Sequence, residues 1–384
     1  MNVNQKAQWL PRTELEAKSR EGLTGLLRWA CAQVPYYREF CSQAGLDPAR
    51  VRADDLPVFP LVTKRDLMDR QERFLASGRI TPECLPSSTG GSTGVVFKFF
   101  LDRRARDPRA ANAMLGESWT GWLPGDRQAV LWGHPREGKI ARSLRGRVVA
   151  TYVHRSLHLN TYDMDETVLA DFAARLRMWR PVMIRGYASA LAFLSEYLTR
   201  NGIDIDPPRG IISTAETLTD EYRASIEGCF DCRVMNRYGS QEFAMIAQQC
   251  EQVAGLHVFI DRVHLEIVRP DGNPREPGER GEMVITCFDN RAMAFIRYRT
   301  GDLARRLEGT CACGRGFPLL AAVEGRTSEV IVGKNASTIP ARVRASTGAT
   351  SRASDRCSSF RRLWKRSKSA LYQLGIGARK APCN

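Results

Sequence analysis

The sequence predicts an α/β body, then a strand-rich region and a basic tail. Up to about residue 235, stretches with apolar residues at helical spacing alternate with short apolar runs typical of buried strands. After that point, short runs of strand-forming residues are separated by turn signals. At 384 residues, 43% of them apolar, the chain is longer than one typical domain of roughly 100 to 200 residues and can bury a sizeable core.

The first predicted element is a helix that begins near Glu14 and ends at the Val34-Pro35 step, because a residue before proline avoids the helical region. Its apolar positions at helical spacing include Leu15, Leu23, Leu26, Leu27 and Ala30. Two further helices are expected at 166–178 and 188–197, and buried strands at 182–184, 210–213 and 233–235. Helices that alternate with strands in this way indicate an α/β fold.

Strands are also expected at 256–259, 264–268 and 282–287, separated by turns at 270–272 and 277–278. We interpret this region as a β-rich subdomain that closes the body. Beyond about Gly333, Ser, Thr, Ala and Arg dominate without periodicity, which is typical of a disordered or poorly specified tail.

The formal net charge of +15 raises the question of a nucleic-acid partner. Residues 342–384 hold eleven Lys and Arg and one acid, a net charge of +10, so the rest of the chain carries only +5. Without a basic strand interleaved with aromatic residues or a recognition helix, a nucleic-acid partner is not expected. The N-terminus lacks the apolar run of a secretory signal, no apolar stretch is long enough to span a membrane, and a cytoplasmic location is expected.

The strongest local signal is a loop rich in glycine and hydroxyl side chains: Ser87, Ser88, Thr89, Gly90, Gly91, Ser92, Thr93 and Gly94. Three glycines let the backbone curl around an anion, and five hydroxyls add donors, which suits a polyphosphate. Val95 stands where a Walker loop would continue with lysine, so the loop is not that of a P-loop NTPase. Taken alone, it is equally consistent with a flexible linker.

Three more motifs follow in order. They are Asn236-Arg237-Tyr238-Gly239-Ser240-Gln241-Glu242, Tyr298-Arg299-Thr300-Gly301-Asp302 and Gly325-Arg326. Together with the loop they resemble the adenylate-forming superfamily, whose members have a Ser/Thr/Gly phosphate loop, then Tyr-Gly-x-x-Glu, Tyr-x-Thr-Gly-Asp and Gly-Arg. Shorter runs at 35–38, 56–67 and 186–191 resemble the phenylacetate-CoA ligase and CapK-like branch.

The resemblance implies the large N-terminal adenylation domain over residues 1–330. It also implies ATP-dependent activation of a carboxylate to an acyl-AMP, followed by transfer to CoA or another thiol. Residues 87–94 would wrap the β- and γ-phosphates, and Glu242 would hold Mg²⁺, which prefers oxygen ligands. The remaining nucleotide contacts would come from Ser213, Ala215, Glu216, Asn236, Tyr238, Gly239, Asp302 and Arg326, with Asp302 on the ribose hydroxyls.

Cys250, His257, Cys311 and Cys313 supply three thiolates and an imidazole, which is the donor set of a closed structural zinc site. Reduced cysteines without a metal are the alternative. The eleven cysteines of a chain without a signal peptide are not expected to form a disulfide scaffold.

His134 and Tyr187 are candidates for the acyl pocket by position, with a packing role equally open. Family members carry a C-terminal lid domain whose lysine contacts the reacting carboxylate. Residues 331–384 do not resemble such a lid, and no catalytic lysine can be nominated among them. Two functions therefore stay open: an acyl-adenylating ligase for a small carboxylate, or a pseudoenzyme that binds ATP without efficient turnover.

Overall fold

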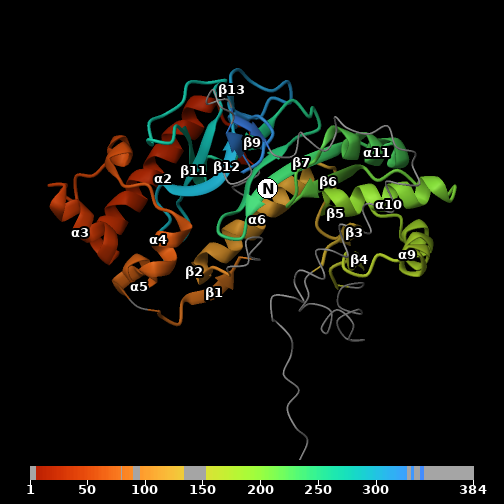
Figure 1. Ribbon diagram of the computed structural model, residues 1–384, viewed down its shortest axis with the longest axis horizontal. Helices are drawn as coiled ribbons and strands as arrows, with labels where there is room; N and C mark the ends of the chain where they lie inside the picture. Colours follow the sequence, from red (N-terminus) through yellow and green to blue (C-terminus); the bar gives the residue numbers. More distant parts are fainter. Residues whose placement is uncertain are drawn as a thin grey trace, which may run out of the picture. The chain divides into compact units, whose positions relative to one another are not determined.

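The computed structural model describes residues 6–78, 80–89, 96–133, 153–326, 330–332 and 338–340. The chain divides into two compact units, Met1–Ser328 and Glu329–Asn384. In the second unit, strand β15 (Val330–Val332) pairs antiparallel with β16 (Thr338–Pro340). All the contacts analysed below lie within the first unit, which is drawn in Figure 1.

The first unit begins with a group of helices, and the first of them is the helix that the N-terminal periodicity predicts. Its helices are α2 (Arg12–Gln33), α3 (Pro35–Gln43), α4 (Lys64–Asp69) and α5 (Gln71–Phe74), with short 3-10 helices at Ala53–Val58 and Ala76–Gly78. The break between α2 and α3 falls at the predicted step, where Val34 adopts an extended conformation before Pro35. A disulfide joins Cys31 to Cys41 across this break.

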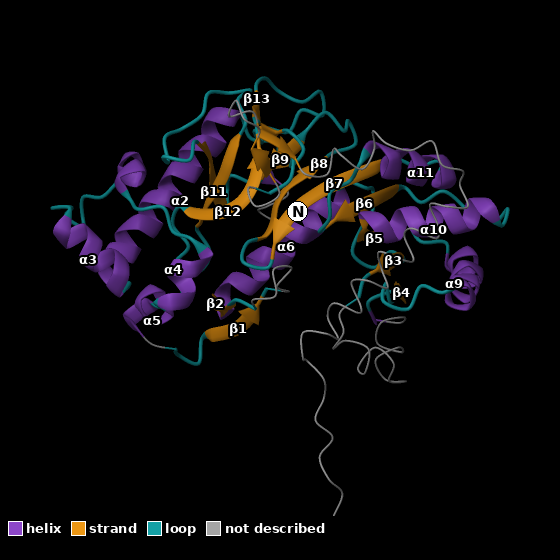
Figure 2. Ribbon diagram, in the orientation of Figure 1, coloured by secondary structure: helices purple, strands orange, loops and turns teal. Residues whose placement is uncertain are grey.

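A nine-stranded sheet forms the centre of the unit, in the order β13-β14-β9-β8-β7-β6-β5-β3-β4 (Figure 2). Its parallel strands are β3 (Gln128–Leu131), β4 (Ser156–Leu159), β5 (Met183–Tyr187), β6 (Gly210–Thr214) and β7 (Val234–Ser240). Its antiparallel strands are β8 (Ala244–Gln249), β9 (Leu256–Val258), β13 (Arg306–Leu307) and β14 (Leu319–Leu320).

Helices cover both faces of this sheet. One face packs against α9 (Glu166–Trp179), α10 (Ala188–Arg200) and α11 (Asp220–Phe230) around a core that includes Ile184, Ile211 and Val234. On the other face, Trp122 packs against Met183 and Ile212, and α6 (Arg106–Ser118) packs against β8 (Figure 1). The two expected helices are α9 and α10, so the helical periodicity located both elements.

A separate three-stranded antiparallel sheet contains β10 (Val263–Val268), β11 (Gly281–Cys287) and β12 (Tyr298–Ala304). A two-stranded sheet pairs β1 (Cys84–Ser88) with β2 (Lys98–Asp102). The expected β-rich subdomain is therefore only partly separate, since β8 and β9 extend the central sheet. The reason is the tight reversal after β7, which pairs Ser240 with Ala244 and returns the chain antiparallel onto the same sheet.

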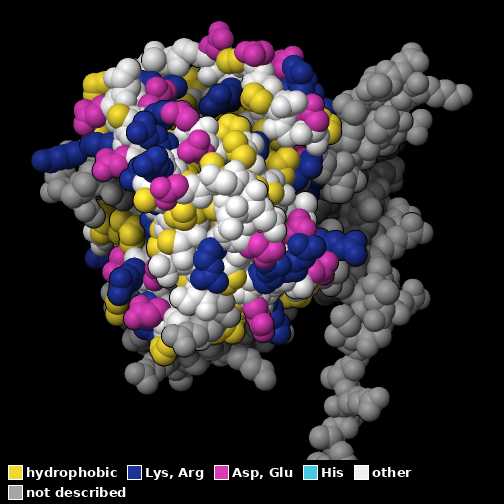
Figure 3. Space-filling model, turned by 90° about the vertical axis from the view of Figure 1, so that its left-hand side faces the viewer, with side chains coloured by type: hydrophobic (Ala, Val, Ile, Leu, Met, Phe, Trp, Pro, Cys, Tyr) yellow, Lys and Arg dark blue, Asp and Glu magenta, His cyan; other side chains and the backbone are white. Residues whose placement is uncertain are grey.

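One face of the molecule is mixed in charge (Figure 3). On the face drawn in Figure 3, which lies on the side of α3 to α5 in Figure 1, basic and acidic side chains are interspersed. None of the helices that the structure describes has both the length and the apolar composition needed to cross a membrane.

Candidate active site and metal cluster

Three of the predicted nucleotide residues meet at the end of β7. The Tyr238 hydroxyl donates to Oδ2 of Asp302 at 2.7 Å, and Nε of Arg326 donates to Oδ1 of the same carboxylate at 3.2 Å. Asp302 lies on β12 in the second sheet, and its backbone bridges to that of Arg326. Three motifs that are far apart in sequence thus converge on one carboxylate.

The electrostatics of this group keep the tyrosine protonated. Burial, and then the negative charge of Asp302, raise the pKa of the Tyr238 hydroxyl well above its usual value. The phenol therefore remains a hydrogen-bond donor to the Asp302 carboxylate at neutral pH. Arg326 is half exposed, whereas the Asp302 side chain keeps only 16% of its exposure. The carboxylate is thus fixed from two sides and held at the sheet edge.

Glu242 follows β7 in the tight turn into β8 and is buried. The turn requires a glycine, because a Cβ on Gly239 would lie 2.2 Å from the carbonyl oxygen of Ala244. The Tyr298 hydroxyl hydrogen-bonds Glu242, and burial together with this carboxylate raises the pKa of that hydroxyl. Glu242 and Asp302 are therefore each held by the hydroxyl of a buried tyrosine.

The predicted wall residues lie at the ends of β6 and β7. Ser213 is fully buried, and its Oγ has no partner among the described residues. Ala215 adopts a left-handed backbone with φ +66°, a conformation that is strained for a residue other than glycine. An oxygen of Glu216 accepts from the backbone N–H of Ser189 at 2.9 Å, at the start of α10. Asn236 lies beside Ser213 in the parallel pair of β6 and β7.

The phosphate-loop prediction is only partly described by the structure. Ser87 and Ser88 end β1, and the backbone N–H of Thr89 donates to the carbonyl oxygen of Phe97 at 2.9 Å. The rest of the predicted loop, Gly90, Gly91, Ser92, Thr93 and Gly94, lies outside the described residues. His134 also lies outside them. Tyr187 stacks on Trp132 with ring centroids 4.3 Å apart, and its hydroxyl donates to the Gly133 carbonyl at 3.3 Å.

The four predicted metal ligands form one cluster, with all four ligand atoms within 4.8 Å of one another. The sulfurs of Cys250 and Cys311 are 3.6 Å apart, and the Cys313 sulfur is 3.4 Å from Nε2 of His257. Zn–S bonds of about 2.3 Å and Zn–N bonds of about 2.0 Å in a tetrahedron place such atom pairs roughly 3.5 to 3.8 Å apart. The spacing of the donors fits a zinc ion.

The surroundings of the cluster also suit a metal. Backbone N–H groups of Gln252 and Arg315 donate to the sulfurs of Cys250 and Cys313, each at 3.4 Å. Burial and the nearby Arg315 lower the pKa of His257 to about 4, so the imidazole is neutral and free to ligate at pH 7. Burial alone would raise the pKa of the Cys313 thiol, but hydrogen bonds from Arg315 outweigh it and lower that pKa. A neutral imidazole and a thiol inclined to ionise are the forms that bind zinc.

Arg315 fixes this cluster to the N-terminal segment. Its guanidinium lies 4.6 Å from the centre of the Trp119 ring, pairs with both oxygens of Glu251 at 2.9 Å, and donates to Gln8 at 3.0 Å. A Cβ at Gly316 would lie 2.0 Å from the Leu10 carbonyl oxygen, so the two backbones are in close contact there. The cluster therefore joins the edge of the central sheet to the start of the chain.

Comparisons with known proteins identify relatives that match most of the chain. No family model matches the chain. Phenylacetate-coenzyme A ligases of Thermus thermophilus and Escherichia coli are 26% and 28% identical, over 90% and 86% of this chain and 78% and 75% of their own length. Protein CapK of Staphylococcus aureus is 23% identical over 70% of this chain and 58% of its own. Over most of its length the chain is thus similar to phenylacetate-CoA ligases and CapK, and it resembles the adenylate-forming superfamily.

Solved structures show the same fold. An open conformation of 2-hydroxyisobutyryl-CoA ligase matches with a TM-score of 0.69 at 21% identity, covering 88% of this chain and 81% of that one. The described body is thus an α/β adenylation domain, and the chain is similar to AMP-forming acid-thiol ligases.

Two contacts in this adenylate-forming domain were missed by sequence reasoning. Tyr298 was part of a quoted motif but received no role, although its hydroxyl bonds Glu242. Arg109, at the start of α6, donates from Nη2 to the carbonyl of Gln241 at 2.9 Å, while its Nη1 is buried without a partner among the described residues. Only the motif position of Tyr298 could have indicated its role, and no local signal marks Arg109.

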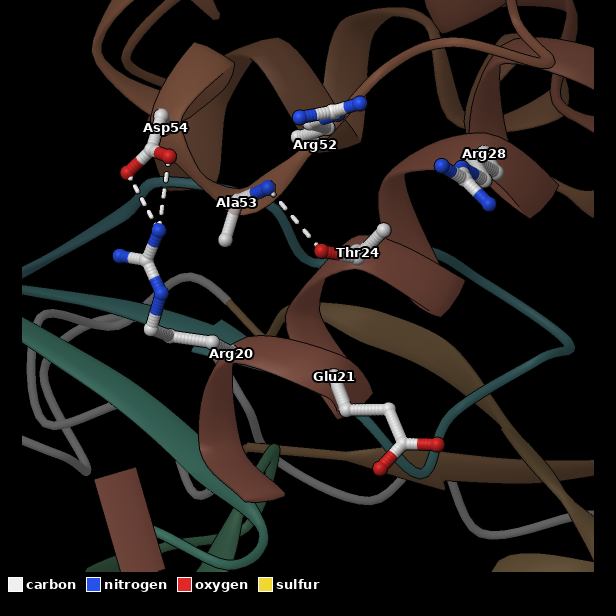
Figure 4. A pocket seen from close by; sticks show the side chains of 7 residues that line it. All are labelled: Arg20, Glu21, Thr24, Arg28, Arg52, Ala53 and Asp54. Carbon is white, nitrogen blue, oxygen red and sulfur yellow. Dashed lines mark hydrogen bonds and ion pairs between the residues drawn. The ribbon is translucent and has the colours of Figure 1, made fainter. Parts of the chain in front are cut away.

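A hollow of about 400 Å³ lies elsewhere on the adenylation domain, between α2 and the following 3-10 helix (Figure 4). It is lined by Arg20, Glu21, Thr24, Arg28, Arg52, Ala53 and Asp54. Nη2 of Arg20 bonds both oxygens of Asp54 at 2.7 Å, so part of its basic lining is already neutralised. None of the predicted site residues lines it.

Proposed function

We propose that this chain activates a carboxylate with ATP and passes the acyl group to a thiol, with CoA as the expected acceptor. In the first step a carboxylate oxygen attacks the α-phosphorus of ATP, the bond to pyrophosphate breaks, and acyl-AMP forms. In the second step a thiol attacks the acyl carbonyl, a thioester forms, and AMP leaves. The observation that carries this proposal is the convergence of Tyr238, Arg326 and Asp302 beside Glu242.

Each of these residues receives a defined role. The Asp302 carboxylate accepts hydrogen bonds from the ribose hydroxyls, with Tyr238 and Arg326 fixing its orientation. The Tyr238 ring stacks on adenine, and Asn236 reaches the amino edge of the base. Glu242 would hold Mg²⁺, which neutralises phosphate charge, and its buried position beside Tyr298 restricts its rotamer. Residues 87–94 wrap the β- and γ-phosphates in this proposal.

ATP–pyrophosphate exchange against a panel of carboxylates tests the proposal, with equilibrium binding of ATP measured first. We expect exchange that requires Mg²⁺ and that occurs with a particular carboxylic acid of the panel. A purified, folded chain that binds no ATP would contradict the proposal. A variant with Glu21→Gln, which changes a charged residue of the hollow in Figure 4, is a control that should exchange like the unaltered chain.

The second candidate function is that of a pseudoenzyme. Residues 331–384 are rich in Arg and Ser, and no lysine among them can be matched to the lid lysine of the family. We propose that residues 331–384 supply no catalytic lysine, so that residues 1–384 by themselves bind ATP but adenylate slowly. Fusing the C-terminal domain of a related ligase after Glu329 should then raise the rate of exchange. Fast exchange by residues 1–384 alone would exclude the pseudoenzyme.

We also propose that the cluster of Cys250, His257, Cys311 and Cys313 holds one structural zinc ion. Three thiolates and one imidazole close a tetrahedral site and leave no position for a substrate. Metal analysis of purified protein should give one zinc per chain. Cys311→Ser should lose it, whereas Cys84→Ser, at a cysteine outside the cluster, should keep it.

A further inference from the structure

A group of charged side chains is buried between α6 and the central sheet. An oxygen of Glu117, on α6, pairs with Nη1 of Arg185 on β5 and lies 3.6 Å from Nη1 of Arg237 on β7. Nε of Arg237 donates to Oε1 of Gln248 at 2.6 Å, and the Gln248 amide donates to the Gly116 carbonyl at 2.6 Å. These contacts join three strands and one helix.

The charges of this group do not balance. Two guanidinium groups face one carboxylate, and the Gln248 amide is neutral. The Arg237 and Glu117 side chains each keep only 8% of their exposure, and Nη2 of Arg237 is buried without a partner among the described residues. Burial lowers the pKa of Arg237 to about 10, so it stays protonated at pH 7. A positive charge is thus buried with an unused donor, which is costly unless an anion pairs with it.

Arg297, between β11 and β12 in the chain, is an arginine whose hydrogen-bond donors all have partners. It is also buried, and it donates to both oxygens of Glu266 and to the carbonyls of Pro57, Phe59 and Gly272. Its side-chain nitrogens are all in use, and its charge is matched by a carboxylate of its own. Arg237 is buried like Arg297, but its Nη2 has no partner among the described residues, and it shares the Glu117 carboxylate with Arg185. This difference indicates that the Arg237 guanidinium has a role beyond packing.

A second buried polar group lies on the same helix, α6. Asn112 on α6 has no exposure, and both its amide oxygen and its amide nitrogen lack partners among the described residues. It lies one helical turn before Gly116, which contacts Met245 and Gln248, and about one turn after Arg109, which bonds Gln241. Asn112 therefore lies beside the carboxyl end of β7, and its amide adds a donor there.

The location is that of a ligand site in a parallel sheet. Side chains alternate along a strand, so Arg237 and Tyr238 point to opposite faces of β7. The face of Arg237 also carries Thr214, its neighbour on β6, and Tyr187, the next residue across on β5. Ligands of open α/β sheets bind at the carboxyl ends of the strands. Arg185 keeps 28% of its exposure, so the group is accessible.

We propose that the carboxylate substrate of this chain carries a second anionic group, which pairs with Arg185 and Arg237. The inference rests on the proposed function. The nucleotide would lie on the Tyr238 side of β7 and the acid on the Arg237 side, with the reacting carboxyl at the strand ends between them. The second anion would supply the missing negative charge, and Arg237 Nη2 and the Asn112 amide would donate to it. A simple apolar acid would leave these donors buried and unpaired, which disfavours it.

The test uses the full chain and stable mimics of acyl-AMP, in which a sulfamate links the acyl group to adenosine, so that binding is measured without turnover. Two matched pairs serve as probes: succinyl against butyryl, and 4-carboxyphenylacetyl against 4-methylphenylacetyl. Charge-assisted hydrogen bonds should make at least one carboxyl-bearing mimic bind about ten- to a hundredfold tighter than its partner. The ratio of the two affinities does not depend on the fraction of protein that is folded.

In Arg185→Met and Arg237→Met that ratio should fall to about one or below. Arg223→Met is the matched control, since Arg223 is 23% exposed and pairs with Glu227 on α11 at the other face; its ratio should not change. Two results would overturn the inference and leave the proposed function intact. One is tighter binding of both uncharged mimics by the unaltered chain, and the other is an affinity ratio that stays unchanged in both Arg185→Met and Arg237→Met. Failure to bind ATP and every mimic would overturn the proposed function and the inference with it.

Discussion

Replacing Asp302 with alanine should weaken ATP binding by about two to four orders of magnitude. Its two oxygens accept from different donors, Oδ2 from Tyr238 and Oδ1 from Arg326, which orients the carboxylate, and in the proposed function each oxygen accepts from one ribose hydroxyl. Two charge-assisted hydrogen bonds contribute about 1.5 to 3 kcal/mol each. Their loss amounts to about 3 to 6 kcal/mol, or about 10² to 10⁴ in dissociation constant.

The same change should leave the chain folded. Arg326 is half exposed, so its ion pair contributes little to stability. The buried Tyr238 hydroxyl loses its acceptor, at a cost of about 1 to 3 kcal/mol. That cost is smaller than the typical free energy of unfolding of about 5 to 15 kcal/mol. Thermal unfolding of the variant should therefore remain cooperative, with a lowered midpoint.

Titration calorimetry of both proteins with Mg-ATP checks this prediction, and Tyr238→Phe is the control. That variant loses the same hydrogen bond but keeps the aromatic ring and the carboxylate, so its ATP affinity should change far less. An unchanged ATP affinity in Asp302→Ala would refute the ribose role. An equal loss in Tyr238→Phe would show that the intramolecular bond, and not the carboxylate itself, determines affinity.

Three further predictions concern metal, turnover and pH. Chelation of zinc, or Cys250→Ser, should lower the thermal midpoint and expose the sheet edge to proteolysis, and metal content measured with the midpoint checks this. Residues 1–384 by themselves should bind ATP yet exchange pyrophosphate well below the rates on the order of 1 to 10³ s⁻¹ that are typical of enzymes, because no lysine among residues 331–384 was matched to the family lysine that acts on the transition state; initial rates decide it. Burial raises the pKa of Asp261 to about 6, above its unfolded value, so its unfavourable ionisation weakens folding as pH rises from about 4 to 6. Asp261→Asn should therefore stabilise the chain by about 1 to 3 kcal/mol at pH 8 but little at pH 4, as measured by denaturant unfolding at both values.

Local patterns located many elements but did not specify their neighbours. The break at Val34 and the helices α9 and α10 follow from proline and apolar spacing, both of which act over a few residues. Strand β9, expected at 256–259, was assigned to a separate subdomain, and β8 was not expected as a strand, because a local pattern does not specify which strand edge a segment pairs with. That pairing depends on the close approach of Gly239 to the Ala244 carbonyl, a tertiary feature.

The candidate site, too, was predictable where it depends on residue type and not where it depends on tertiary pairing. The four donors of the metal cluster were recognised by residue type, but their approach depends on the pairing of β9 with β14, which brings Leu319 beside His257. The group of Glu117, Arg185 and Arg237 has no sequence signature. Its members are 68 and 52 residues apart along the chain, and each alone reads as an ordinary surface charge. Only the sheet register shows that they share one face.

Strand β7 links the two halves of the proposed reaction. Because its side chains alternate, any shift of one residue in its pairing would exchange the faces of Tyr238 and Arg237. The register with β8 is irregular between Tyr238 and Gly239, at the point where the strand reaches the sheet edge. The missing side chain of Gly239 permits the tight turn that contains Glu242. In the proposed reaction, the orientation of the nucleotide, the position of the Mg²⁺-binding carboxylate and the selectivity for the acid would therefore all depend on the register of one seven-residue strand. Residues so close in sequence could serve different ligands because their side chains alternate between the two faces.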